Sequence, residues 1–133
     1  MKKTLRGMVV LVGLTVFGVA QGANWVMLSA QSNVSTYLID TDSIVKGQND
    51  TVRAWIQERP KVIPMKLSNG VAYDDHKYLT LVYCKTRMNS VGPSYWYLVG
   101  NPVFTMGGYS EPSEVIPDSM GEAIWTTLCR PGT

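Results

Sequence analysis

Two cysteines, Cys84 and Cys129, constrain the fold of this chain more than any other feature. Joined to each other, they would close a loop of about 45 residues, for which the chain-entropy model gives roughly 4 kcal/mol of stabilisation. An even number of cysteines in an oxidising compartment favours such a disulfide. The alternatives are a free reactive thiol or a metal pair, although two ligands cannot close a tetrahedral zinc site by themselves. The choice depends on the compartment in which the chain folds.

The first 22 residues have the pattern of a signal peptide. The segment begins with three cations, which are Lys2, Lys3 and Arg6. An apolar run follows from Met8 to Ala20 and is too short to cross a bilayer, which takes about 20 residues. Small residues close the run, so we predict cleavage after Gly22; an uncleaved anchor is the alternative. No cysteine follows the run, so no lipid attachment is expected there.

Cleavage would leave residues 23–133 as a single domain with one modest core. This part has nine basic and 10 acidic residues, because the signal peptide carries three of the 12 basic ones and no acidic one. A nearly neutral domain gives no reason to expect nucleic acid as a partner. We expect an exported protein, periplasmic or secreted to the cell surface, without a stable membrane anchor.

Short alternating or β-rich segments separated by turn residues predict an antiparallel sheet of about six strands. The predicted strands are 25–30, 34–39, 51–58, 77–87, 94–99 and 103–106. The turn signals are residues 47–50, Gly100-Asn101 and Asn69-Gly70, the last inside a surface excursion with two short arms. The predicted class is therefore α+β, mainly β.

The end of the chain predicts one helix. Ser119 and Glu122 match a capping box, and Arg130-Pro131-Gly132 ends the segment. Apolar residues fall on one face at helical spacing, namely Met120, Ala123, Ile124 and Leu128. A helix this short is not stable alone, so it must pack on the sheet.

The alternation of side chains in residues 77–87 indicates where the helix packs. Tyr78, Thr80, Val82, Cys84 and Thr86 share one face of this predicted strand. If Cys84 is bonded to Cys129, the helix lies on this face. The opposite face is then apolar in the middle and basic at its ends, and it consists of Lys77, Leu79, Leu81, Tyr83, Lys85 and Arg87.

This second apolar face needs burial of its own, because a sheet covered on one side is usually polar on the other. Curling of the sheet into a half-barrel could supply it. A homodimer or a bound ligand could supply it as well, and the residues do not choose among the three.

Several segments together resemble the surface-adhesin protein E family of Gram-negative bacteria. They are Trp25 near the predicted mature start, YLIDTDSI at 37–44, VRAWI at 52–56, LVYCKTR at 81–87 and IWTTLC at 124–129. The resemblance implies a curved antiparallel sheet with a helix tied to it by one disulfide. It also implies an adhesin that binds host matrix proteins such as vitronectin or laminin. The chain departs from the family in lacking a lipobox cysteine after the leader, which implies a form that is not lipid-anchored.

The resemblance also implies candidate binding residues. In the family adhesin, a basic stretch around the strand with the first disulfide cysteine binds the host protein. The matching positions here are Lys77, Lys85 and Arg87. An ordinary solvated strand edge is the alternative interpretation, because lysines there discourage edge-to-edge pairing.

Catalytic, metal and cofactor sites have little support in the sequence. Asp74-Asp75-His76 is the only cluster of metal-ligand residue types, and neighbouring side chains on an extended segment alternate sides. We expect a solvated loop there, with an adventitious metal or haem contact as the alternative. His76 lies in no triad or elbow motif, so no catalytic residue, metal or cofactor is predicted.

The sequence thus predicts a non-catalytic exported binding module with a protein partner. The alternative is a periplasmic envelope-accessory protein, or a homodimeric structural subunit without a host ligand. An unusual hydrolase or a haem-binding protein centred on His76 is a third hypothesis.

Overall fold

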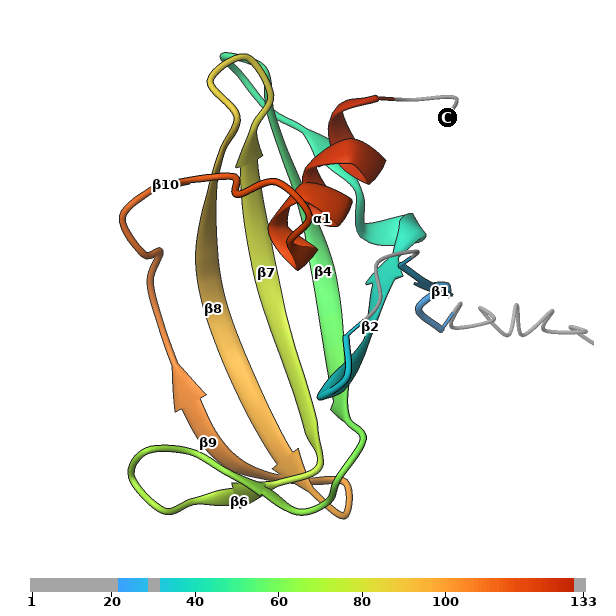
Figure 1. Cartoon of the computed structure of the whole chain (residues 1–133), viewed down its shortest axis with the longest axis vertical. Helices are drawn as coiled ribbons and strands as arrows, with labels where there is room; N and C mark the ends of the chain where they lie inside the picture. The colour runs from blue at the N-terminus through green and yellow to red at the C-terminus, as the bar shows by residue number, and fades with distance from the viewer. Residues whose placement is uncertain (1–21, 29–31, 131–133) are drawn as a thin grey trace, which may run out of the picture.

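A computed structural model describes residues 22–28 and 32–130, so the predicted signal peptide lies almost entirely outside the described residues. An eight-stranded antiparallel sheet makes up most of the molecule (Figure 1). Its main path runs β1 (Trp25–Met27), β2 (Ser35–Asp40), β4 (Thr51–Pro60), β7 (Asp75–Tyr83), β8 (Met88–Leu98) and β10 (Ser113–Glu114). The predicted mainly β class is confirmed, with more strands than the six expected.

The remaining elements extend this path at its sides. β3 (Val45–Lys46) pairs with β4, and β9 (Asn101–Met106) pairs with β8. A short 3-10 helix, η1 (Thr41–Ser43), follows β2. β5 (Met65–Lys66) and β6 (Ala72–Tyr73) form a separate two-stranded hairpin around the predicted Asn69-Gly70 turn.

The C-terminal helix α1 (Met120–Cys129) lies across one face of the sheet (Figure 1). Its cap forms as predicted, because the Ser119 side chain accepts a hydrogen bond from the Glu122 amide. The Glu122 carboxylate in turn accepts from the amide of Asp118, not of Ser119. Ile124, Trp125 and Leu128 are the buried residues of α1.

The core lies between α1 and the face of the sheet formed by alternate residues of β4 and β7. Val52, Ala54 and Ile56 pair directly with Val82, Thr80 and Tyr78 across the two strands. All six are buried, and α1 covers them. The predicted helix-bearing face is therefore confirmed.

A disulfide joins Cys84 to Cys129, with Cα atoms 5.5 Å apart. This bond links the end of α1 to the residue that follows β7, as predicted. The described part of the chain has no free cysteine.

The predicted strand at residues 77–87 is wrong at its C-terminal end. β7 stops at Tyr83, and residues 84–87 form the turn to β8. Arg87 has φ 51°, a left-handed conformation that a non-glycine residue adopts mainly in turns. β8 accordingly begins at Met88, six residues before the predicted start at Ser94.

Candidate functional site

The face of the sheet opposite α1 carries the candidate site, and we call it the open face. On β4 it presents Arg53, Trp55 and Arg59, because residues 52, 54 and 56 point into the core. On β7 it presents Lys77, Leu79, Leu81 and Tyr83, and on β8 Tyr95 and Tyr97. The sheet bends along its long strands, and in the described residues its strand path does not close into a barrel, so Leu79, Leu81 and Tyr83 on this face stay only partly buried (Figure 1).

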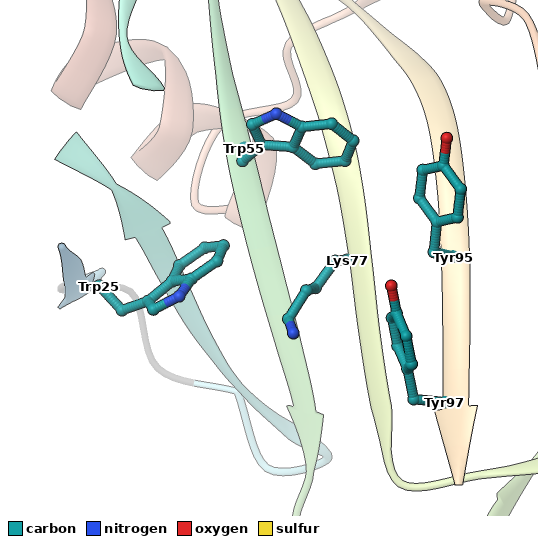
Figure 2. Close-up of a pocket in the computed structure, with 5 residues that line it drawn as sticks. All are labelled: Trp25, Trp55, Lys77, Tyr95 and Tyr97. Atoms are coloured by element: carbon teal, nitrogen blue, oxygen red, sulfur yellow. The ribbon is translucent and has the colours of Figure 1, made fainter. Parts of the chain in front are cut away.

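A pocket of about 280 Å³ lies on the open face (Figure 2). Its walls are four aromatic side chains around one cation, namely Trp25, Trp55, Tyr95, Tyr97 and Lys77. They come from four strands, with Trp25 on β1, Trp55 on β4, Lys77 on β7 and the tyrosines on β8. Figure 2 shows the aromatic side chains arranged around Lys77, with α1 behind the sheet.

Strand pairing sets the positions of these side chains. Lys77 is the direct partner of Tyr95, and Asp75 is the direct partner of Tyr97. The Trp55 and Tyr95 rings lie on diagonal positions across β7, with centroids 6.0 Å apart and a tilt of 45°. Tyr95 is 37% exposed, so the sheet holds these rings in place while part of their surface remains open to solvent.

Two neighbours, Asp75 and Tyr97, hold Lys77 in the pocket. Its Nζ lies 3.5 Å from the Asp75 carboxylate and 4.9 Å from the centroid of the Tyr97 ring. Asp75 is itself fixed by a 2.9 Å hydrogen bond that the buried Gln57 side chain donates to its Oδ1. An ammonium group has three donors, so Lys77 keeps bonding capacity for a ligand.

The other two predicted binding residues do not lie beside Lys77. Tyr83 ends β7 about 20 Å from Lys77 at the usual strand rise, and Lys85 and Arg87 lie in the turn beyond it. The cations that share the open face with Lys77 are Arg53 and Arg59, and both are exposed.

Lys85 and Arg87 make different contacts. Lys85 is 83% exposed and pairs with Asp50 at 2.8 Å, which raises the pKa of its ammonium group. Arg87 turns toward the helix, where it pairs with Glu122 at 2.8 Å and covers the Trp125 ring. The amide of Asp118 and the Arg87 guanidinium hold the pKa of Glu122 below its usual value. Arg87 therefore also supports the packing of α1.

The sequence profile of surface-adhesin protein E matches residues 25–130, which is most of the chain. The chain belongs to the surface-adhesin protein E family. Neither curated proteins nor solved structures gave a significant match.

Membership of the surface-adhesin protein E family implies export to the surface and a non-enzymatic, protein-binding role. The matched region begins at Trp25 and ends at Arg130, so it includes the pocket, the disulfide and α1. No helix within residues 22–28 and 32–130 is long and apolar enough to span a membrane.

His76 does not lie in a solvated loop, and that prediction was wrong. It belongs to β7, points to the same side of the sheet as α1 and stacks on Trp96 with ring centroids 4.2 Å apart. Its Nδ1 lies 3.1 Å from the Glu58 carboxylate. Asp74 and Asp75 do not contact His76. Asp74 accepts a hydrogen bond from the Val99 amide, and Asp75 lies on the open face, where it accepts one from Gln57. In the part of the chain that the structure describes, no three such side chains gather as metal ligands.

Glu58 lies at the centre of a polar cluster that also contains Ser35, Tyr37 and His76. Its carboxylate accepts hydrogen bonds from Ser35 at 2.8 Å and Tyr37 at 3.2 Å in addition to the contact with His76. Burial raises the pKa of Glu58, but the hydrogen bonds from its three neighbours outweigh burial and lower it below 4.5. Burial, together with the Glu58 charge, raises the pKa of Tyr37 to about 12. The cluster is consistent with a role in packing.

Part of the pocket can be predicted from local sequence patterns. Alternation in residues 52–56 placed Trp55 opposite the core, and alternation in residues 77–83 did the same for Lys77. Local patterns do not place Trp25, Tyr95 and Tyr97 in the same site. They reveal neither which strands are neighbours nor the register in which those strands pair.

Proposed function

We propose that this protein is a non-catalytic exported binding module that contacts host extracellular-matrix proteins, such as vitronectin or laminin, through its open face. Membership of an adhesin family carries the proposal. The open face supports it, because partly exposed Trp and Tyr side chains together with arginine are typical of protein contact surfaces. Three of its cations, Arg53, Arg59 and Lys77, favour an acidic partner.

Lys77, Lys85 and Arg87 are the proposed contact residues. Lys77 would act at the pocket, whereas Lys85 and Arg87 would act at the tip of the β7–β8 hairpin. A partner that contacts all three must therefore extend along β7 for about 20 Å or more. A standard protein interface buries about 800 Å² on each partner, which is ample for that length.

The test is binding of the mature protein to immobilised vitronectin and laminin at two salt concentrations. At low salt, we expect the K77A/K85A double variant to bind at least about tenfold more weakly than the wild type. At high salt this difference should become smaller, because screening weakens charge pairs. Arg87 is tested separately as Arg87→Lys, since its contacts with Glu122 and Trp125 make alanine a risk to the fold.

If the double variant binds as tightly as the wild type, Lys77 and Lys85 are not contact residues. No binding of the wild-type protein to either matrix protein removes the adhesin proposal. A stable homodimer by light scattering, indifferent to both ligands, would instead favour a structural subunit whose open face is the dimer interface.

A further inference from the structure

The pocket of the open face has a lining that selects a ligand of particular chemistry. We propose that it binds a carboxylated sugar ring, such as a sialic or hexuronic acid, with the ring stacked on Trp55 and its neighbours and the carboxylate paired with Lys77. The inference rests on the proposed function only in taking the open face as the contact surface.

The aromatic side chains supply the stacking surface. The face of an aromatic ring is electron-rich, and the C–H bonds on one side of a pyranose carry partial positive charge, so the two stack. Trp25, Trp55, Tyr95 and Tyr97 offer such rings from two sides of the pocket (Figure 2). The phenol groups of the tyrosines can exchange hydrogen bonds with sugar hydroxyls.

Lys77 selects the charge of the ligand. An apolar side chain in the pocket would remove water from the ammonium group without replacing its hydrogen bonds, which is unfavourable. Aromatic cages also suit quaternary ammonium ligands, but Lys77 already occupies the centre of this one and would repel a second cation. A carboxylate satisfies the free donors of Lys77.

The charges around the pocket favour the same ligand. Arg53 and Arg59 are exposed on the same face of β4, on either side of Trp55 along the strand. The acidic residues that β2 and β7 place on this face already have partners within the protein. Asp75 pairs with Lys77 and accepts a hydrogen bond from Gln57. The buried Asp40 accepts hydrogen bonds from the amides of Asn24 and Asp42. An anionic ligand therefore meets an excess of available positive charge.

The size of the pocket limits how much of a glycan it holds. Its volume of about 280 Å³ is at the lower end for small-molecule sites, which usually begin near 300 Å³. The ligand is therefore one ring, with the rest of the glycan or glycoprotein lying over the open face. An acidic peptide would pair with Lys77 but leave most of the aromatic surface uncovered.

The test titrates the mature protein with sialyllactose, with a hyaluronan tetrasaccharide and with neutral lactose, followed by NMR chemical shifts and tryptophan fluorescence. We expect saturable binding of one charged sugar, about tenfold or more tighter than lactose. The two charged arms distinguish a sialic acid from a hexuronic acid.

Three variants locate the binding. Lys77→Gln should remove the preference for the charged sugar over lactose. Trp55→Leu, which keeps apolar bulk on β4, should weaken binding about tenfold through loss of stacking. Lys66→Gln is the matched control, because it removes an exposed cation on β5 that does not line the pocket, and it should bind as the wild type does.

Failure of both charged sugars to saturate by about 10 mM, beyond the range for a ring held by one pocket, would overturn the inference. Tighter binding of a poly-glutamate peptide than of either sugar would overturn it as well, as would unchanged binding in Trp55→Leu and Lys77→Gln. If the sugars fail while the protein still binds vitronectin or laminin, the proposed function stands without this inference. If a sugar binds and neither matrix protein does, the pocket stands and the matrix partner is wrong.

Discussion

Glu58 is the residue on which the polar cluster below α1 depends. Its carboxylate receives hydrogen bonds from Ser35 and Tyr37 and contacts His76, so the buried charge is compensated from three directions. A neutral amide in place of the carboxylate would keep only one acceptor oxygen and turn an NH₂ group toward one of these neighbours, which costs more than the net value of the lost bond itself. The pKa of Glu58 is lowered, so the carboxylate is ionised at neutral pH.

We predict that Glu58→Gln lowers the free energy of unfolding at pH 7 by about 1–3 kcal/mol. A carboxyl group with a lower pKa in the folded protein than in the unfolded chain stabilises the fold above its unfolded pKa, and this contribution is lost as pH falls through the folded pKa. The difference between wild type and variant should therefore shrink as pH falls below the ordinary value of 4.5.

Urea unfolding at a series of pH values measures this difference. Glu111→Gln, at an exposed position, is the control and should change stability little. A penalty for Glu58→Gln that is as large at pH 3 as at pH 7 would show that the carboxylate charge is not the cause.

Among the elements, α1 depends most on its attachments. It has 10 residues, too few for a stable isolated helix. Its packing on β4 and β7, the ion pair between Arg87 and Glu122 and the disulfide all hold it at the same end of the sheet. The bond to Cys84 is placed where β7 ends, so it fixes the helix and the β7–β8 turn together.

We expect reduction of the disulfide to lower the melting temperature sharply while the β signal in circular dichroism persists below the transition. The chain-entropy model gives roughly 4 kcal/mol for a loop of this length, and each kcal/mol shifts the melting temperature of a domain of about 100 residues by roughly 4–8 °C. Calorimetry with and without reductant measures the shift. Two free thiols titrated in the unreduced protein would contradict the bond itself.

Local sequence signals predicted most elements where turn chemistry was explicit. The Asn69-Gly70 turn and the Ser119 cap are confirmed, and both rest on residues with strong conformational preferences. The turn at residues 84–87 contains no glycine, proline or asparagine, so the pattern of β7 appeared to continue through it.

The predicted strand at residues 94–99 is too short, because the first half of β8 contains residues typical of turns. Gly92 lies inside this strand, and a side chain there would collide with the Tyr109 ring and the Leu79 carbonyl. The pattern at residues 74–76 predicts a solvated loop, because three consecutive polar side chains cannot all face one ion and precede the apolar alternation of β7. The stack on Trp96 that makes His76 a core residue depends on the pairing of β7 with β8, which local pattern does not reveal.

At the scale of the whole molecule, the sheet separates two environments. The face toward α1 holds the core, the disulfide-linked helix and the Glu58 cluster. The open face holds the aromatic pocket and exposed cations. Trp25, three residues after the predicted cleavage site, forms part of that pocket, so the mature N-terminus bears directly on the binding surface.

We predict that the exported protein begins at Ala23 and carries one disulfide. Intact-mass spectrometry of the protein purified from periplasmic, outer-membrane and culture-medium fractions tests both points. A retained leader would contradict cleavage after Gly22. Protein confined to the periplasm would contradict a role in contacting a host.

β4 uses both of its faces, with Ile56 in the core and Trp55 in the pocket. A deletion of one residue within it would exchange these two side chains between the faces. Changes of chain length should therefore be tolerated mainly between strands, for example at the exposed residues 61–64. Substitutions at exposed positions of the open face, such as Tyr95, leave the core untouched, so this surface can diversify while the architecture is inherited unaltered.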